Sequence, residues 1–170
     1  MRTTVADVSY VPFAIRPMTE TDARAVAAWH YHGDYVFYDM DQDPDDLAEP
    51  LDPAQWGRRY FAVDDERELV GYFVFKVRDG VAEVGLGLRP DLTGRGRGDA
   101  FLRAGLCFAA TTLAVKSYTL AVAAFNDRAI TVYERAGFVE VERYQHRTNG
   151  GVHQFVRMTR EPLNSDQPRD

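Results

Sequence analysis

The sequence predicts an α+β domain with three layers, in which helices flank a mixed, mostly antiparallel sheet of about six or seven strands. Three observations predict this class. Segments with alternating apolar residues follow one another with short turns over 59–88, which is typical of an antiparallel meander. A glycine-rich loop then opens a segment with helical periodicity, and another alternating segment follows closely. A strand, a helix and a strand joined by short links imply a right-handed parallel crossover.

Length and composition fit one domain. The chain has 170 residues, 45% of them hydrophobic and 27% charged, and we expect the domain to span 13–160 with flexible flanks at 1–12 and 161–170. The net charge is −6, so we expect neither nucleic acid nor a membrane as a partner. Neither a membrane helix nor a signal peptide is evident in the sequence, which favours a cytoplasmic protein.

The N-terminal part is predicted to hold a strand, a helix and a variable region. Residues 13–16 alternate as in a strand, which a proline ends. Thr19 and Asp22 have the spacing of a capping box, so we expect a helix that runs from there to Tyr31. Aromatic, acidic and proline residues mix over 33–56, where we expect a loop with a short helix.

The central part is predicted to be the meander. A strand begins near Arg59 and ends at the polar segment 64–67, which turns the chain. Residues 69–77, rich in Val, Tyr and Phe, form the next strand. The Asp-Gly pair at 79–80 predicts a tight hairpin, because glycine accepts the positive φ of such turns, and 81–88 is the strand that follows.

The C-terminal part alternates helices and strands. The loop 94–98 opens a helix, 118–124 is a strand, 127–135 is a short helix that ends before Gly137, and 139–159 is a hairpin with an Asn-Gly-Gly turn. Apolar residues share one face of the first of these helices: Leu102, Leu106, Ala109 and Leu113. We expect Cys107 in that helix to be a small buried hydrophobe.

The loop 94–98 reads Gly-Arg-Gly-Arg-Gly and suits a pyrophosphate. Such a group needs backbone N–H groups at close range, and it gains from a helix N-terminus behind it. A P-loop is excluded because the chain lacks its Gly-Lys-Ser/Thr, and a dinucleotide fingerprint starting at Gly94 fails because Asp99 replaces its last glycine. A flexible surface turn is the alternative reading of the loop.

Two segments resemble motifs of the GNAT superfamily of acetyl-CoA-dependent N-acetyltransferases. Thr93-x-x-Gly96-x-Gly98 resembles its coenzyme motif A, in which Gln or Arg usually stands in place of Thr93. Residues 120–138, ending in Tyr-Glu-Arg-Ala-Gly-Phe, resemble its motif B. The resemblance implies direct acetyl transfer from acetyl-CoA to a primary amine, which would be a protein N-terminus, a lysine or a small amine. The alternatives are an acyl-CoA-binding sensor or interaction module without catalysis and, less favoured, a nucleotide-binding protein.

The resemblance also implies which residues form the site. Backbone groups of Leu86 and Leu88 would hold the oxyanion and the pantetheine, and Arg95 or Arg97 would compensate for Thr93. Tyr133 would be the general acid that protonates the leaving thiolate, unless it only packs in the core. The coenzyme residues implied are Leu86, Leu88, Thr93, Gly94, Arg95, Gly96, Arg97, Gly98, Asn126 and Ala129.

Glu83 is the candidate base, because some members of the superfamily use a glutamate on this strand. Glu83, Gly85 and Gly87 share one face of the strand, and the glycines would leave that face open beside the carboxylate. A lysine-like amine has a pKa of about 10.4 and must lose a proton before it reacts. The alternative is a solvated strand carboxylate.

The acceptor is expected to bind the variable region, where aromatic and acidic residues suit an amine with an apolar body. The candidates are Tyr35, Phe37, Tyr38 and Asp39; their aromatics would otherwise only pack on the core. We expect no metal: in the acidic segment 39–52, Pro44 and Pro50 stand where a calcium loop has its glycine and its final glutamate, and His30 and His32 are too close in sequence for joint ligation on a helix. His146 and His153 would face each other in the last hairpin. We expect a monomer or a homodimer.

Overall fold

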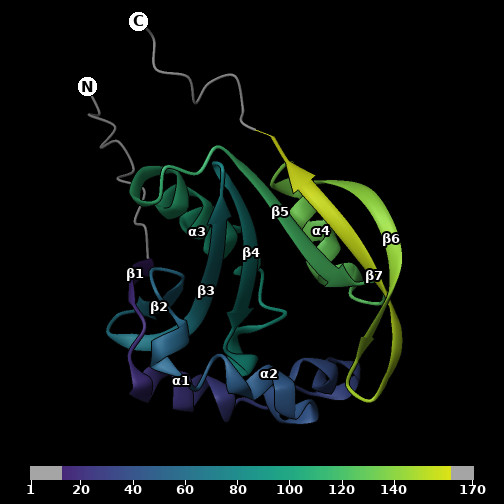
Figure 1. Ribbon diagram of the computed structural model, residues 1–170, viewed down its shortest axis with the longest axis horizontal. Helices are drawn as coiled ribbons and strands as arrows, with labels where there is room; N and C mark the ends of the chain where they lie inside the picture. Colours follow the sequence, from purple (N-terminus) through teal and green to yellow (C-terminus); the bar gives the residue numbers. More distant parts are fainter. Residues whose placement is uncertain (1–12, 162–170) are drawn as a thin grey trace, which may run out of the picture.

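The computed structural model describes residues 13–161, and their backbone forms one seven-stranded mixed sheet with flanking helices (Figure 1). The strands are β1 (Phe13–Pro17), β2 (Tyr60–Asp65), β3 (Glu68–Arg78), β4 (Val81–Leu88), β5 (Ser117–Ala123), β6 (Val139–Thr148) and β7 (Gly151–Arg160). Their order in the sheet is β1-β2-β3-β4-β5-β7-β6, and only β4 and β5 are parallel. The predicted fold class and the parallel crossover are confirmed. The predicted flanks lie outside the described residues, apart from Glu161.

Helices cover both faces of the sheet. They are α1 (Glu20–Ala27), α2 (Pro44–Ala48), α3 (Gly98–Thr112) and α4 (Asp127–Arg135), with a 3₁₀ helix η1 (Gly33–Tyr38) in the variable region. In Figure 1, α3 and α4 lie behind the strands, and α1 and α2 lie along the lower edge. In the described part of the chain, no helix is long and apolar enough to cross a membrane.

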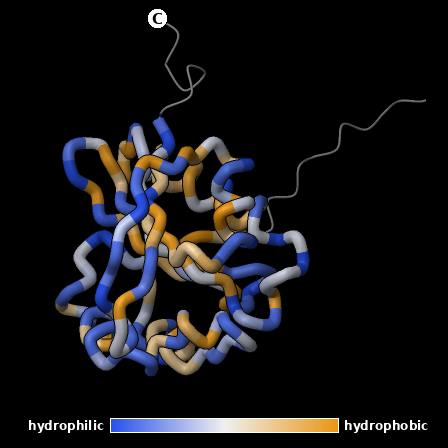
Figure 2. The backbone as a smooth tube through the Cα atoms, turned by 90° about the vertical axis from the view of Figure 1, so that its right-hand side faces the viewer, coloured by the Kyte–Doolittle hydropathy of each residue, from blue (hydrophilic) through white to orange (hydrophobic). Residues whose placement is uncertain are grey.

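The larger core fills the space between the sheet and the helices α3 and α4. Phe73 and Phe75 of β3 are fully buried there beside Phe101 and Leu102 of α3. The helix can approach β3 closely at Gly105, where an added Cβ would lie 2.2 Å from Cζ of Phe73. Figure 2 shows apolar segments running through the interior of the fold and hydrophilic segments at its outer turns.

A smaller core lies on the opposite face of the sheet, under α1. Its buried members are Met18, Ala23, Trp56 and Tyr60, and Tyr72 and Val74 of β3 pack against them. Side chains of a strand alternate between the two faces, so β3 contributes its phenylalanines to one core and Tyr72 and Val74 to the other.

One of the two hairpin turns within β2–β4 matches its prediction, and the other is shorter than predicted. Asp79 and Gly80 both have positive φ, of 52° and 76°, and confirm the predicted tight turn. The turn predicted at 64–67 is shorter than expected, because only Glu66 and Arg67 leave the strands, with φ of 49° and 71°. Two residues without glycine therefore adopt the same left-handed geometry.

The first helix begins as predicted and ends early. Thr19 Oγ1 accepts a hydrogen bond from the Asp22 N–H (3.2 Å), and the Asp22 carboxylate accepts one from the Thr19 N–H (2.8 Å), which completes the capping box. The helix stops at Ala27, not at Tyr31. The reason is that Tyr31 bonds elsewhere: its N–H donates to Asp39 (2.7 Å), and its hydroxyl donates to the Leu88 carbonyl (2.9 Å).

The expectation that Cys107 is buried is wrong. This residue is exposed, although it lies in the predicted helix α3. Leu102, Leu106 and Ala109 turn one side of α3 toward the core, and Cys107 lies outside that apolar stripe.

Candidate active site

The candidate site lies where β4 and β5 diverge. The two strands pair only at Val81–Ser117, Ala82–Tyr118 and Glu83–Thr119. Beyond Glu83, the edge of β4 that faces β5 has no strand partner among the described residues. The Leu88 carbonyl accepts a hydrogen bond from the Tyr31 hydroxyl (2.9 Å), and the other backbone polar groups along this edge are available to a ligand.

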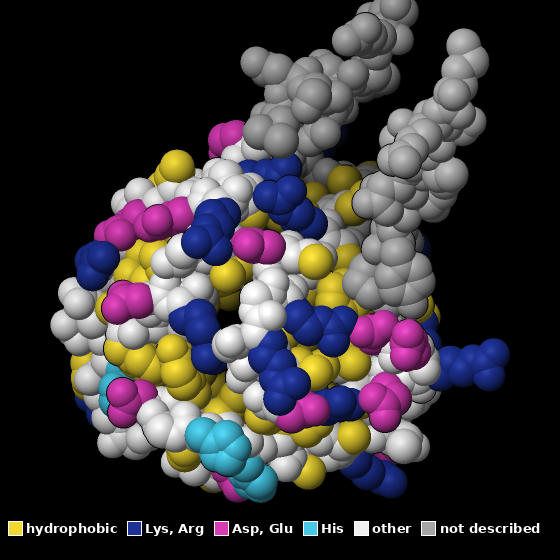
Figure 3. Space-filling view, turned by 180° about the vertical axis from the view of Figure 1, so that it is seen from behind, with side chains coloured by type: hydrophobic (Ala, Val, Ile, Leu, Met, Phe, Trp, Pro, Cys, Tyr) yellow, Lys and Arg dark blue, Asp and Glu magenta, His cyan; other side chains and the backbone are white. Residues whose placement is uncertain are grey.

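A cavity of about 620 Å³ occupies this opening on the side of α3 and α4. Figure 3, seen from that side, shows basic side chains around a hollow in the surface. Most of the predicted coenzyme residues come together in its lining: Leu86, Leu88, Thr93, Gly94, Gly96, Gly98, Asn126 and Ala129. We call it the coenzyme cavity. Gly94 and Gly96 are exposed and have φ of 71° and 74°, a conformation that favours glycine.

The two arginines of the loop do not line the coenzyme cavity. Arg97 instead forms an ion pair with Asp65 of β2, and its guanidinium carbon lies 5.2 Å from the centre of the Phe13 ring. Arg95 is exposed. Neither side chain lies in the lining where it would compensate for Thr93, so that role stays a prediction. Thr93 itself lines the cavity, with its hydroxyl bonded to the Pro90 carbonyl (2.8 Å).

Arg128 of α4 lies where the loop arginines were expected, and it was not among the residues predicted from the sequence. It lines the coenzyme cavity, and an added Cβ on Gly94 would lie 3.0 Å from its Nη1. Its guanidinium carbon lies 4.2 Å from the centre of the Tyr35 ring, which supports it from below by a cation–π contact. The sequence could have indicated this residue, because Arg128 stands in the first turn of the helix that Asn126 caps.

Tyr133 of α4 faces the coenzyme cavity with a free hydroxyl. Among the described residues, none forms a hydrogen bond with that hydroxyl, and burial raises the pKa of Tyr133 above its ordinary value of 10. The phenols of Tyr38 and Tyr72 lie near enough to raise it further. Tyr133 therefore keeps its proton at neutral pH and can donate it.

Asn126 fixes the beginning of α4 and one wall of the opening. Its Oδ1 accepts a hydrogen bond from the Ala129 N–H (3.1 Å), which caps the helix. Its Nδ2 donates to the Tyr38 hydroxyl (3.0 Å). The residue that caps α4 thus also holds an aromatic residue of η1 in place.

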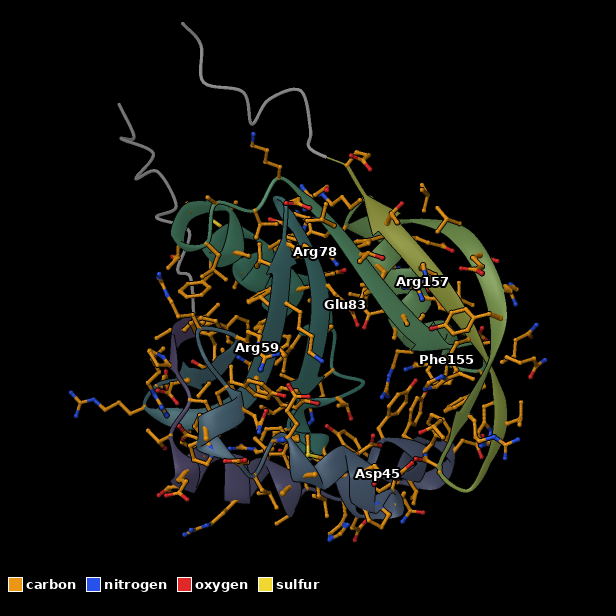
Figure 4. All side chains as sticks on the ribbon, in the orientation of Figure 1. Asp45, Arg59, Arg78, Glu83, Phe155 and Arg157 are labelled. Atoms are coloured by element: carbon orange, nitrogen blue, oxygen red, sulfur yellow. The ribbon has the colours of Figure 1, made fainter. Side chains whose placement is uncertain are left out.

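A second cavity of about 420 Å³ lies on the opposite side of the opening, and we call it the acceptor cavity. Its lining includes several aromatic and charged residues, among them Phe37, Tyr38, Asp46, Tyr60, Tyr72, Lys76, Glu83, His146 and Phe155. Figure 4 labels Glu83 on β4 and Phe155 on β7, which belong to this lining. The two cavities share Tyr38, Tyr72, Val84, Gly85 and Ala121, so they meet between β4 and β5.

Glu83 lines the acceptor cavity and is exposed, but its face of β4 is not open as expected. The ring of Tyr72 lies over Gly87: an added Cβ there would be 2.3 Å from Cε1 of Tyr72. At Gly85 an added Cβ would make an ordinary contact, 3.5 Å from Cβ of Val74. The glycine at 87 therefore makes room for a neighbouring side chain of the protein.

The four predicted acceptor residues separate in the structure. Phe37 and Tyr38 line the acceptor cavity, whereas Tyr35 lines the coenzyme cavity under Arg128. Asp39 lines neither cavity; it is 4% exposed and accepts hydrogen bonds from the Tyr31 N–H (2.7 Å) and His30 Nδ1 (2.9 Å). Its role is therefore to hold the turn after α1, and it is withdrawn as an acceptor residue.

The acceptor cavity also contains residues that sequence reasoning missed. Asp46 of α2 has its pKa raised by burial and by the nearby carboxylates of Asp43 and Asp45. His146 of β6 contributes to the same lining and pairs across the hairpin with His153, as the sequence predicted. His153 lies 4.9 Å from the Phe37 ring, measured between ring centres.

One group of side chains resembles a metal-ligand set, and its members were not grouped by their sequence spacing. His30, Asp39 and Asp41 each place a ligand atom within 4.8 Å of the others. Both Asp39 oxygens already accept the hydrogen bonds that hold the turn after α1. This group lies outside both cavities.

Comparison with known proteins identifies the family. A family model described as an acetyltransferase (GNAT) domain matches residues 13–139. A mycothiol acetyltransferase of Clavibacter michiganensis subsp. michiganensis is 39% identical over 119 residues, which cover 69% of this chain and 37% of that protein. The chain thus spans little more than a third of that relative's length.

Solved structures share the fold. A chimera of the spermidine N-acetyltransferase SpeG of Vibrio cholerae and hSSAT superposes with a TM-score of 0.72 at 23% identity, covering 88% of this chain and 95% of that one. The Vibrio cholerae enzyme with CoA and spermine gives 0.69 at 22% identity, over 87% and 94% of the two chains. A putative phosphinothricin N-acetyltransferase gives 0.68 at 20% identity, over 89% and 99%.

Proposed function

Because this chain belongs to the GNAT family of acetyltransferases, we propose that it transfers an acetyl group directly from acetyl-CoA to a primary amine. The observation that carries the proposal is the meeting of two cavities between β4 and β5. Donor and acceptor can approach from opposite sides of the sheet and react where the cavities join. Direct transfer also suits the residues present, since Cys107, the one cysteine of the chain, lines neither cavity.

The coenzyme cavity has the groups that acetyl-CoA requires. The loop glycines Gly94 and Gly96 expose backbone N–H groups at the N-terminal end of α3, where the helix dipole favours a pyrophosphate. Arg128 adds positive charge beside them. The unpaired edge of β4, at Leu86 and Leu88, would hold the pantetheine and the thioester oxygen. Acetyl-CoA supplies the activated acetyl group.

Two side chains would move the protons. Tyr133, kept neutral by burial, would protonate the departing sulfur. Glu83 lies on the acceptor side and would take the proton of the amine, through water. The two groups come from opposite sides of the opening, which matches the separate places where a proton is removed and where one is needed.

The acceptor cavity favours a cationic amine with an apolar body. Phe37, Tyr38 and Phe155 offer aromatic surface, and the carboxylates of Asp46 and Glu83 offer negative charge. The relatives are named for mycothiol and for spermidine, so a mycothiol precursor and polyamines are acceptors to test.

An acceptor screen tests the proposal. Acetyl-CoA is incubated with the protein and single amines: peptides with a free N-terminus or a lysine, polyamines, aminoglycosides, amino metabolites and a mycothiol precursor. We expect release of free CoA that depends on one class of amine, with the acetylated product identified by mass spectrometry. Binding of acetyl-CoA without turnover on any amine would contradict the proposal and favour a binding module.

A further inference from the structure

Two aromatic side chains converge on the junction between the cavities. Of the five residues shared by both linings, only Tyr38 and Tyr72 have large side chains. Tyr38 comes from η1 and is fixed by its hydrogen bond with Asn126. Tyr72 comes from β3, on the other side of β4. The free space at the junction is therefore bounded by two rings that reach it from different elements.

The position of Tyr72 depends on a missing side chain in the neighbouring strand. Tyr72 is paired with Gly87 in the β3–β4 ladder. An added Cβ at Gly87 would lie 2.3 Å from Cε1, 2.8 Å from Cζ and 2.9 Å from the hydroxyl oxygen of Tyr72. The ring thus extends across β4 toward the opening. The indole of Trp29 packs beside it at a tilt of 39°, with 6.3 Å between ring centres.

The ring is also close to the proposed chemistry. The Tyr72 phenol is near enough to Tyr133 to raise the pKa of that residue. Burial, with the carboxylate of Asp46, raises the pKa of Tyr72 itself to about 12, so its hydroxyl stays neutral. No described residue forms a hydrogen bond with that hydroxyl. The side chain is a neutral wall of the space in which an acyl group would meet Tyr133.

We propose that the ring of Tyr72, held over Gly87, limits the length of the acyl group that the protein accepts on coenzyme A. The inference rests on the proposed function of the same site. An acetyl group needs little space beyond its carbonyl, whereas a butyryl chain must extend into the junction that Tyr38 and Tyr72 narrow. A single methylene in an apolar pocket changes discrimination by about 10- to 200-fold, so one ring is enough to set the limit.

The test compares the binding of acetyl-CoA, propionyl-CoA and butyryl-CoA by titration calorimetry, without an acceptor amine. We expect the unmodified protein to prefer acetyl-CoA and Tyr72→Ala to reduce its preference over butyryl-CoA by about tenfold. Tyr72→Phe keeps the ring and should keep the preference. An unchanged preference in Tyr72→Ala, or an equal loss in Tyr72→Phe, would overturn the proposal. The outcome is a ratio of affinities measured on one protein, so a partly unfolded sample does not change it.

A second pair of variants tests whether Gly87 acts through the ring. In the unmodified protein, Gly87→Ala should push the ring into the junction and weaken acetyl-CoA binding relative to free CoA. In Tyr72→Ala the same substitution should have little effect, because no ring is left to displace. Equal effects in both backgrounds would contradict the mechanism. Since no amine is present, these titrations do not depend on the acceptor screen. They can be interpreted even if no amine in the screen is acetylated.

Discussion

Arg128 shows at the scale of a single residue how the coenzyme site differs from its motif. The sequence places two arginines within the glycine loop, but Arg97 is engaged with Asp65 and Arg95 is exposed. The cation that approaches Gly94 comes from α4. Which arginine faces the loop depends on how α4 packs beside α3, and the local sequence of the loop does not determine that packing.

Replacing Arg128 should therefore weaken coenzyme binding. We expect Arg128→Gln to raise the KM for acetyl-CoA by about tenfold or more with little change in kcat, because a hydrogen bond to a charged group contributes about 1.5–3 kcal/mol. Arg95→Gln removes the same charge from the loop and serves as the matched control. Steady-state kinetics at varied acetyl-CoA concentrations measures the KM and kcat of both variants. A larger effect of Arg95→Gln would indicate that the loop arginine, and not Arg128, contacts the coenzyme.

The role of Tyr133 makes a separate prediction. We expect Tyr133→Phe to lower kcat by about 100-fold or more, while the Kd for acetyl-CoA changes little, since the ring and its packing remain. Because burial holds the pKa of Tyr133 above 10, loss of its proton should not reduce activity across the neutral and moderately alkaline range. A pH–rate profile and a coenzyme titration of both proteins measure this. Unchanged turnover would remove Tyr133 from the chemistry.

At the scale of elements, Arg16 joins β1, α1 and β2. Its Nε donates to Asp64 of β2 (2.6 Å), and its Nη1 donates to Asp22 of α1 (2.6 Å). Asp22 also accepts the N–H of Thr19 at the helix start. One guanidinium thus fixes the beginning of α1 against the edge of the sheet. Arg16 is partly exposed, so its ion pairs contribute less than buried ones would.

This link predicts a stability that depends on pH. The Arg16 guanidinium holds the pKa of Asp22 below its ordinary value of 3.8. A lowered pKa in the folded protein gives stability that is present above pH 3.8 and is lost as the pH falls through the folded value. We expect Asp22→Asn to lower the free energy of unfolding by about 1 kcal/mol at pH 7, and this difference should vanish in acid.

Urea titrations at several pH values measure that difference. Asp91→Asn is the control, because Asp91 is a more exposed carboxylate whose pKa is also lowered, by the neighbouring Arg89. Its substitution should change stability less. A loss of stability in Asp22→Asn that stays the same from pH 7 to below pH 3 would contradict the role of the ion pair.

The features of helices and strands that depend on adjacent residues were predictable from the sequence, whereas the end of α1 was not. The capping box at Thr19 and the turn at Gly80 follow from a few adjacent residues, and both are confirmed. The end of α1 depends on Asp39 and Leu88, which take the hydrogen bonds of Tyr31. The end of this helix therefore depends on partners that are distant in sequence. The turn at 64–67 was predicted in the right place but too long, because Glu66 and Arg67 adopt positive φ without a glycine.

In the candidate site, too, the residues that are close in sequence were predictable and the residues that are scattered along the chain were not. Most of the residues predicted to bind the coenzyme lie in two continuous motifs, and eight of the ten predicted residues line one cavity. The acceptor cavity is built from single residues on α2, β3, β6 and β7, among them Asp46, Tyr72, His146 and Phe155. Only the folded topology brings these together. The sequence could suggest an aromatic region near Phe37 but could not assign its members to one cavity or the other.

At the scale of the whole molecule, the sheet consists of two parts joined by three residue pairs between β4 and β5. A coenzyme bound in the opening would contact both parts and stabilise the fold. At a concentration of 100 times its Kd, acetyl-CoA should add about 2.7 kcal/mol, which is a rise in Tm of roughly 5–10 °C. Thermal unfolding with and without acetyl-CoA measures it. ATP, which lacks the pantetheine, should raise Tm less; a larger rise with ATP would contradict the coenzyme assignment.

The place of β7 in the sheet has a consequence for the order in which the chain can fold. β7 lies between β5 and β6, which do not pair with each other. The meander β2–β4 closes through contacts between sequence neighbours, so it can form early during synthesis on the ribosome. β5 and β6 must wait for 151–160. Until then β5 has only its short pairing with β4, and unpaired strand edges of this kind invite aggregation with other nascent chains.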